Sequence, residues 1–124
     1  MVQLRFTQLG MNKPTFVKTS NKNMRKTLQY QLDQAKAQDI GNKEPDEQIE
    51  LSLKLIDDTE DYIVDMLGLD DKGKNKLENL ELEQSTEIAT RISLRLNGLS
   101  DQEIDKIFAD DDGEDEVEDE QEKN

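Results

Sequence analysis

The 124-residue chain contains no cysteine, no histidine and no tryptophan. Without cysteine there is neither a disulfide nor a thiolate, which permits a cytoplasmic location. Without both cysteine and histidine, the chain also lacks the commonest general base and the ligands of most transition-metal sites. The remaining candidate groups are lysines and carboxylates on polar helix faces, so we predict that the protein is not an enzyme, has no catalytic residue and uses no cofactor.

Aromatic residues make up only 4% of the chain. Its core must therefore be built mainly from leucine, isoleucine and methionine, and we expect a modest stability that a partner supplements. No apolar run approaches the roughly 18 residues that a membrane span requires, and residues 1–20 lack the apolar stretch of a signal peptide. The sequence therefore predicts no contact with a membrane.

Phosphate-binding and calcium-binding motifs are also missing. The six glycines are scattered and build neither a P-loop nor a dinucleotide motif. The segment 110–113 is similar to part of a calcium loop. With Gly113 in its sixth position, however, Phe108 would stand in the first and Asp119 in the twelfth, where the loop needs a ligand and a glutamate. We therefore predict no metal site.

The charge of the chain is −14 and is graded along its length. Residues 1–43 carry +6, residues 44–109 carry −11 and residues 110–124 carry −9. A protein with this balance is repelled by phosphate backbones and anionic lipids, so we predict no nucleic-acid partner. Basic residues cluster near position 22 without stacking aromatics, and we interpret them as complementing the acidic remainder, either within one molecule or between copies. This cluster consists of Lys18, Lys22, Arg25 and Lys26.

The most acidic stretch is at the end of the chain. Ten carboxylates between Asp110 and Glu122 face a single lysine, and Val117 is the one aliphatic side chain there. Such a segment cannot bury enough apolar surface to offset the entropy lost on ordering. We predict a disordered acidic tail over 110–124, behind a helical domain over 1–109.

The first nineteen residues have the periodicity of strands. Apolar and polar side chains alternate at the start, which is typical of a strand with one apolar face. Turn-forming residues follow over 10–14, and 15–19 are β-branched and aromatic enough for a second strand. The prediction for 1–19 is a β-hairpin or extended arm, which packs on the helices or on another subunit because an isolated hairpin is marginal.

From Ser20 onward the apolar spacing is helical, so that 20–109 is predicted to consist of helices. The predicted helices are 20–41, 45–67, 76–83, a helix that begins at Gln84 or Ser85 and ends at Gly98, and 101–109, with a loop over 70–74. The apolar face of the first helix is formed by Met24, Leu28, Leu32 and Ala35. Helix ends are marked by Gly41, Pro45, Gly68 and Gly98 and by a capping box at Ser100 and Glu103.

The predicted helix 45–67 is the most apolar element and carries two apolar stripes. One contains Ile49, Leu53, Ile56, Ile63 and Leu67. The other contains Leu51, Leu55, Tyr62 and Met66. Two stripes favour a central core helix, and the alternative is that part of this surface binds a partner.

This arrangement resembles the tail assembly chaperones of long-tailed (siphovirus) phages that infect Gram-positive bacteria. The resemblance rests on the apolar and acidic helix 49–68, on the later helical segments up to Phe108 and on the acid-rich end, and it covers roughly residues 20–124. It implies a mainly α-helical protein that acts in the cytoplasm of the bacterial host before the virion is complete. Such a protein is expected to be absent from the mature virion.

The resemblance also implies partners. Proteins of this family bind the tape measure protein, keep that long helical chain soluble and assist tail tube protein in assembling around it. They are typically made in a second, longer form by a programmed frameshift. Residues 122–124 allow one here, because Glu-Lys-Asn can be encoded as GAA AAA AAC. The longer form and a homo-oligomer are therefore further expected partners.

An apolar helix in acidic surroundings is expected to cover apolar stripes of the tape measure protein, while mutual repulsion keeps the complex dispersed. The residues predicted to make this contact are Leu53, Ile56, Tyr62, Ile63 and Met66. Two alternatives stay open. One is a structural tail completion or connector protein that remains in the virion, and the other is a small acidic decoy that binds a basic host protein.

Overall fold

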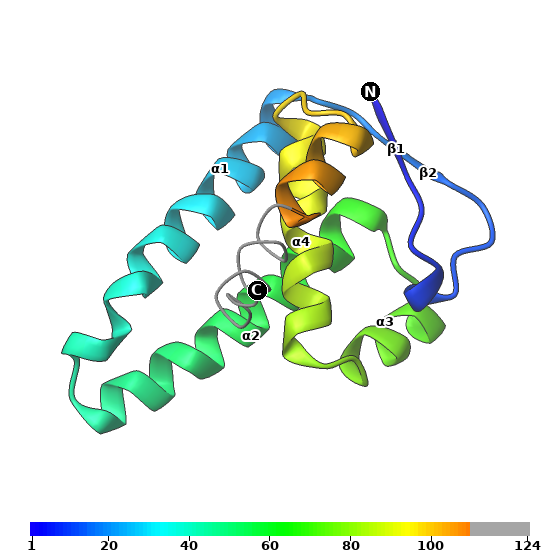
Figure 1. Cartoon of the computed structure of the whole chain (residues 1–124). Coiled ribbons are helices and arrows are strands. Elements are labelled where there is room, and N and C mark those ends of the chain that lie inside the picture. The colour runs from blue at the N-terminus through cyan, green and yellow to red at the C-terminus, as the bar shows by residue number, and fades with distance from the viewer. Residues whose placement is uncertain (110–124) are drawn as a thin grey trace, which may run out of the picture.

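A computed structural model describes residues 1–109 as a helical bundle with a β-hairpin laid across it (Figure 1). The strands are β1 (Val2–Leu4) and β2 (Thr15–Val17), and the helices are α1 (Asn21–Lys36), α2 (Pro45–Leu67), α3 (Asp71–Glu78) and α4 (Leu82–Leu96). Short 3-10 turns cover Thr7–Leu9 and Ala37–Asn42, and 101–109 is a further helical segment. The predicted fold class is confirmed, whereas the prediction of a disordered tail falls on 110–124, outside the described residues.

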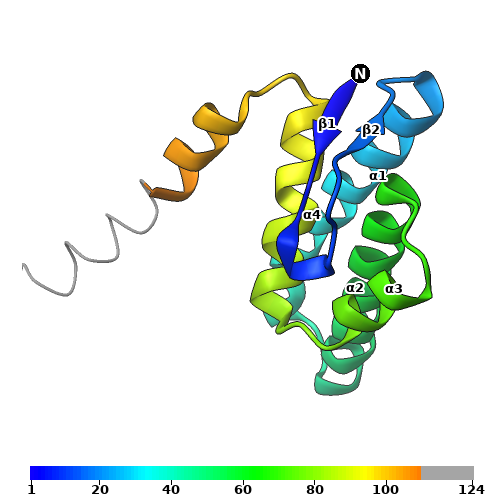
Figure 2. The ribbon, with the colours of Figure 1, turned by 90° about the vertical axis from the view of Figure 1, so that its right-hand side faces the viewer.

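The two strands pair in antiparallel fashion, with Val2 opposite Val17 and Leu4 opposite Thr15. Leu4 and Val17 are buried, because alternate side chains of a strand point to the same face. β1 contacts α4, β2 contacts α2 and the turn Thr7–Leu9 contacts α3, so that the hairpin lies across the bundle (Figure 2). The predicted packing of the hairpin on the helices is therefore confirmed.

α1 and α2 form a helical hairpin, and α4 crosses and contacts both of its helices (Figure 1). The far end of this hairpin, where α1 leads into α2, extends beyond α4. The core lies where α4, the hairpin and the strands meet. Its buried members are Leu4, Phe6, Leu9, Val17, Tyr30, Tyr62, Ile63, Met66, Leu67, Leu77, Ile88, Ala89, Ile92 and Leu96.

Several predicted helix ends are confirmed by their hydrogen bonds. α2 begins at Pro45 and ends at Leu67, and Gly68 caps it with a φ of 61°, which suits glycine because it has no Cβ. In the capping box, the Ser100 amide donates to the Glu103 carboxylate at 2.8 Å, and the Glu103 amide donates to the Ser100 hydroxyl at 3.2 Å. The backbone and hydroxyl hydrogen bonds of Ser100 lower the pKa of Glu103.

The apolar face predicted for α1 packs on the bundle only at Met24, which is partly buried against the core, and the rest of that face is exposed. Leu28 and Leu32 are 56% and 48% exposed, and Thr27 and Tyr30 are buried in their place. The physical reason is a specific pairing with α2, described below, in which the hydroxyls of Thr27 and Tyr30 find partners. α1 also ends at Lys36, before the predicted Gly41, because the chain tightens there into a 3-10 turn.

The prediction of a loop over 70–74 and a helix over 76–83 is also wrong. α3 begins at Asp71, because the Asp70 side chain caps it by accepting a hydrogen bond of 2.8 Å from the Gly73 amide. This cap outweighs the low helix propensity of Gly73. α4 then begins at Leu82, where the Glu81 amide donates to the Gln84 side chain at 3.0 Å.

Candidate functional site

The five predicted partner-binding residues fall into two groups. Leu53 and Ile56 are exposed, by 59% and 36%. Tyr62, Ile63 and Met66 belong to the core and are at most 5% exposed. The two groups differ because the C-terminal half of α2 lies against α4, whereas its N-terminal half extends beyond α4 (Figure 1). Of the five predicted residues, Leu53 and Ile56 alone are available to a partner in this conformation.

The N-terminal half of α2 carries a row of exposed apolar side chains, which we call the α2 stripe: Ile49, Leu53 and Ile56. Their i, i+4, i+7 spacing places them on one side of the helix. The same row continues into the core with Ile63 and Leu67, which are buried. The α2 stripe is therefore the uncovered part of a core-forming face.

Carboxylates flank the α2 stripe along one side of the helix. Along the exposed N-terminal half of α2 the cation is Lys54, and it is paired with Asp58 at 2.6 Å. Asp46, Glu50, Asp57 and Glu60 lie within about a quarter turn of the stripe, whereas Glu47 and Asp58 lie on the opposite side of α2. An apolar strip with an acidic rim fits an apolar helix face that has basic flanks.

The fold raises the pKa of one residue beside the stripe, Glu60. Its pKa is raised by burial first, then by the Glu78 carboxylate and by Asp57 and Asp61. The folded state thus favours the protonated form. Its charged form destabilises the fold once the pH has risen above the unfolded-state pKa of about 4.5.

Replacing Glu60 with glutamine is therefore expected to stabilise the protein at pH 7, by less than about 1 kcal/mol because water screens this side chain. Below about pH 4, where both states bind the proton, the advantage should vanish. Thermal unfolding followed by circular dichroism from pH 3.5 to 8 measures this dependence, and Glu50→Gln on the exposed side of α2 is the matched control. An equal gain at both ends of the pH range would rule out the explanation.

Two threonines and two tyrosines join α1 to α2, and we call them the Tyr–Thr clasp: Thr27, Tyr30, Thr59 and Tyr62. The Thr27 and Tyr62 hydroxyls lie 2.8 Å apart, and the Tyr30 and Thr59 hydroxyls lie 3.1 Å apart. The two rings stack, with centroids 4.7 Å apart and planes 1° from parallel. The clasp fixes the position of α1 along α2, and with it the position of the α2 stripe.

The Tyr–Thr clasp was not predicted, although the sequence contains a signal for it. Each helix contains the pattern Thr-x-x-Tyr, at 27–30 and at 59–62. In an antiparallel pair of helices, two such patterns place each threonine opposite the tyrosine of the other. Burial raises the pKa of Tyr30 and raises the pKa of Tyr62 to about 12, so both hydroxyls stay protonated at neutral pH.

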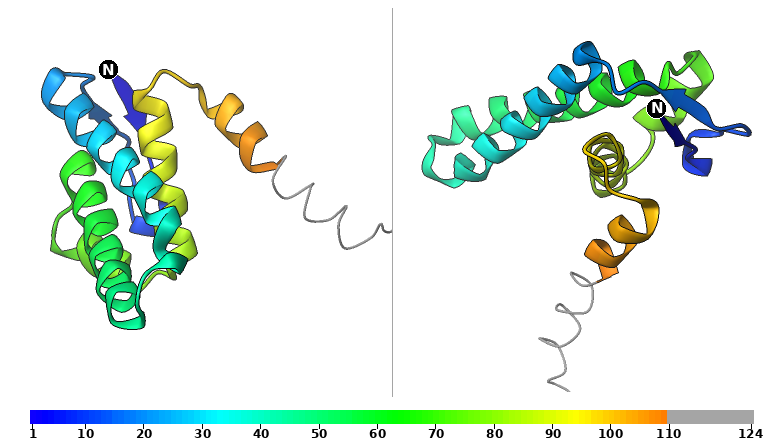
Figure 3. Two further views of the ribbon diagram at one scale, coloured as in Figure 1. Left: turned by 90° about the vertical axis from the view of Figure 1, so that its left-hand side faces the viewer. Right: turned by 90° about the horizontal axis from the view of Figure 1, so that it is seen from above.

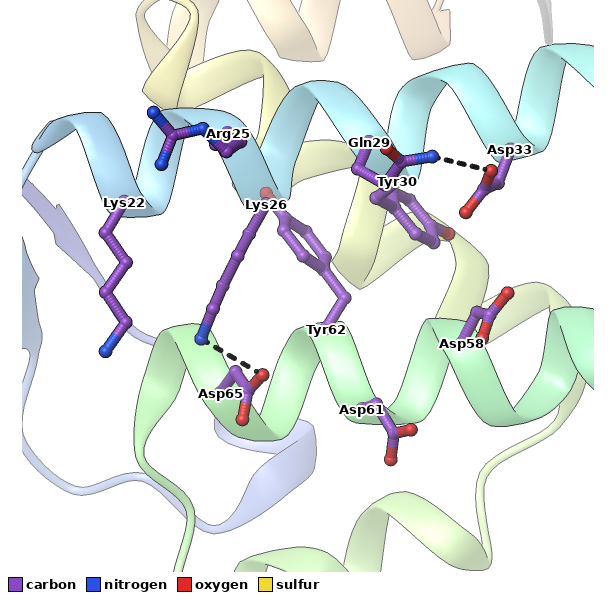
Figure 4. Close-up of a pocket in the computed structure, with 10 residues that line it drawn as sticks. All are labelled: Lys22, Arg25, Lys26, Gln29, Tyr30, Asp33, Asp58, Asp61, Tyr62 and Asp65. Carbon is purple, nitrogen blue, oxygen red and sulfur yellow. Dashed lines mark hydrogen bonds and ion pairs between the residues drawn. The ribbon is translucent and has the colours of Figure 1, made fainter.

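A groove of about 490 Å³ lies between α1 and α2, over the clasp (Figure 4). We call it the charged groove, and Tyr30 and Tyr62 line its floor. Its charged lining residues are Lys22, Arg25, Lys26, Asp33, Asp58, Asp61 and Asp65. In Figure 4 the cations stand at one end, where Lys26 pairs with Asp65 at 3.3 Å, and Asp33 and Asp58 stand at the other.

Two arginines of α4 hold the helical segment 101–109. Arg91 pairs with Asp105 at 2.8 Å and lies 4.8 Å from the centre of the Phe108 ring, and Arg95 pairs with Asp101 at 2.9 Å. Figure 3 shows this segment pointing away from the α1–α2 hairpin. The described chain therefore ends on the opposite side of α4 from the α1–α2 hairpin.

Among residues 1–109, which contain neither histidine nor cysteine, the Asp and Glu side chains form no group of three placed to hold a metal ion. No helix among the same residues is both long enough and apolar enough to cross a membrane.

A family model for phage tail assembly chaperone proteins (TAC) matches residues 2–113 of the chain. The match spans both strands, all four labelled helices and the segment 101–109. No curated protein and no solved structure matches the chain.

Proposed function

The chain belongs to the phage tail assembly chaperone family, since that family's model matches residues 2–113, and from this premise we propose that it binds the tape measure protein, keeps it soluble and assists assembly of the tail tube around it. The family is one of chaperones and not of enzymes. On this proposal the protein acts in the host cytoplasm and is absent from the mature virion. A longer, frameshifted form would share residues 1 to about 122.

The observation that carries the proposal is the α2 stripe. It is apolar, it projects beyond α4 on a helix that the clasp holds in place, and nothing in residues 1–109 covers it. A tape measure protein is a long helical chain with apolar stripes, and an amphipathic helix is recognised through side chains at i, i+4 and i+7. The net charge of −14 gives the complex the repulsion that keeps such complexes dispersed.

The direct test is the double substitution Leu53→Asp with Ile56→Asp. Because both side chains are exposed, the fold should be retained, with an unchanged far-ultraviolet spectrum and a melting temperature within a few degrees of the wild type. Co-expressed tape measure protein should lose most of its soluble fraction, by a factor of about ten, since two charges would face an apolar stripe. The soluble fraction is measured by quantitative blotting after centrifugation.

The matched control is Leu28→Asp with Leu32→Asp, which changes an exposed apolar pair about one helical turn apart on α1. This control should leave the tape measure protein soluble. If both double variants lowered its solubility equally, or if neither did, the assignment of the α2 stripe as the contact would be wrong.

A further inference from the structure

A second groove, of about 490 Å³, lies where α1, α2 and α4 meet. We call it the neutral groove, because none of the ten side chains that line it carries a charge, although 37% of the whole chain is charged. A charged side chain that entered this groove would lose water without meeting an opposite charge in the lining, so the groove favours an uncharged occupant. The lining includes Gln31, Gln34, Gln38, Leu55, Thr90 and Leu94.

Three glutamines form the α1 side of the neutral groove. Gln31, Gln34 and Gln38 are three and four positions apart, so they follow one side of α1 and of the turn after it. Among residues 1–109 no hydrogen bond holds their side-chain amides, whereas the Gln29 amide donates to the Asp33 carboxylate at 3.0 Å. Each amide offers two N–H donors and one acceptor oxygen, so the three together can bond to polar side chains of another molecule.

We propose that the neutral groove binds a helix of the tape measure protein through a face that carries apolar and uncharged polar side chains. This inference rests on the proposed function and adds a second contact beside the α2 stripe. An amphipathic helix lays its apolar side chains in a groove between helices, here against Leu55 and Leu94. Serine, threonine, asparagine or glutamine at the edge of that face would bond to the glutamine amides.

The position of the neutral groove supports a helical occupant. Ile63 of α2 belongs to the core together with Ile88 and Ile92 of α4. Ile56 lies seven positions before Ile63 and therefore on the same side of α2, but beyond the part that α4 covers (Figure 1). Leu55, which lines the groove, is its neighbour, about 100° round the helix. A partner helix that lay beside α4 would thus contact both the neutral groove and the end of the α2 stripe.

This position defines the chemistry of the partner helix. Its flank toward α1 would meet the uncharged amides of the neutral groove. Its other flank would meet the carboxylates beside the α2 stripe, among them Asp57 and Glu60. The partner helix should therefore carry an apolar stripe with uncharged polar residues along one flank and basic residues along the other.

The test places charge in the neutral groove with little change in its shape. Gln31→Glu with Gln34→Glu replaces two amides by carboxylates of nearly the same size and helix propensity, so the far-ultraviolet spectrum should stay unchanged and the melting temperature should move by a few degrees at most. The soluble fraction of co-expressed tape measure protein should fall at least threefold. Gln31→Lys with Gln34→Lys should lower it as well, because the groove disfavours charge of either sign.

The matched controls are Gln8→Glu with Gln102→Glu and Gln8→Lys with Gln102→Lys. Both glutamines are exposed and lie outside the neutral groove, and each pair changes the net charge as much as the corresponding groove pair does. The control variants should leave the tape measure protein as soluble as the wild type does. A control pair that lowered the soluble fraction as much as its groove pair would show that net charge decides, and would overturn the proposal.

The remaining outcomes separate this inference from the proposed function. If only one sign of charge lowered the soluble fraction, the groove would bind a segment of that same sign, and the proposal of an uncharged face would be wrong. If neither groove pair lowered it while Leu53→Asp with Ile56→Asp did, the neutral groove would not be a contact, although the proposed function would hold. If the stripe variant also left the tape measure protein soluble, the proposed function would fail with it.

Discussion

Replacing Tyr62 with alanine is expected to lower the free energy of unfolding by about 3–4 kcal/mol, the usual cost of removing a large buried ring. Tyr62 is 5% exposed, stacks on Tyr30 at 4.7 Å and lies 2.8 Å from the Thr27 hydroxyl. The substitution removes the stack, leaves a cavity between α1 and α2 and deprives Thr27 of its partner. Urea unfolding followed by circular dichroism measures the loss.

Two variants separate these contributions. Tyr62→Phe keeps the ring and removes the hydroxyl, so it should cost about 1 kcal/mol, the usual net value of one hydrogen bond. Phe16→Ala removes an aromatic ring of β2 that is 62% exposed, and should cost less than about 0.5 kcal/mol. Equal losses at Phe16 and Tyr62 would show that the rings of the clasp do not pack as described.

The clasp also predicts how stability changes in alkali. Burial raises the pKa of Tyr62 to about 12, from 10 for the unfolded side chain. A group that ionises less readily in the folded state contributes full stability below the unfolded-state pKa. That contribution is lost as the pH rises from about 10 through about 12. Tyr62→Phe, which cannot ionise, should lose less stability than the wild type between pH 9 and 11.

Local signals in the sequence were sufficient for much of the fold. Strict alternation predicted the strand that begins at Val2, and Pro45 and Gly68 marked the ends of α2 because their backbone preferences act within one turn. The capping box of Ser100 and Glu103 was likewise readable, since both of its hydrogen bonds are local. These features depend on residues within a few positions of one another.

The wrong predictions concern features that depend on contacts between residues far apart in the sequence. Leu28 and Leu32 have core spacing but are exposed, because Tyr30 pairs with a threonine of α2 that is 29 positions away. The apolar periodicity of α2 is also the same along its whole length, so it does not distinguish the buried half from the exposed half. Which half of α2 is buried depends on where α4 crosses it, and no pattern within 45–67 encodes that crossing. The predicted contact set therefore combined two surface residues with three core residues.

That division within α2 predicts different losses of stability for alanine substitutions of two isoleucines in the same apolar row: Ile63, in its buried part, and Ile56, in the exposed α2 stripe. Ile63 is fully buried, and Ile63→Ala should cost about 3 kcal/mol in urea unfolding because it leaves a cavity against the core. Ile56 lies two turns earlier on the same side and is 36% exposed, so Ile56→Ala should cost less than about 1 kcal/mol. Both substitutions remove the same atoms.

The solubility of co-expressed tape measure protein should respond in the opposite order. Ile56→Ala removes contact surface and should lower the soluble fraction at a temperature where both variants are folded. Ile63→Ala should leave that fraction unchanged at the same temperature, because its side chain never reaches the surface. If Ile63→Ala lowered solubilisation while the variant remained folded, the buried half of α2 would have to open on binding, and the contact would extend beyond the α2 stripe.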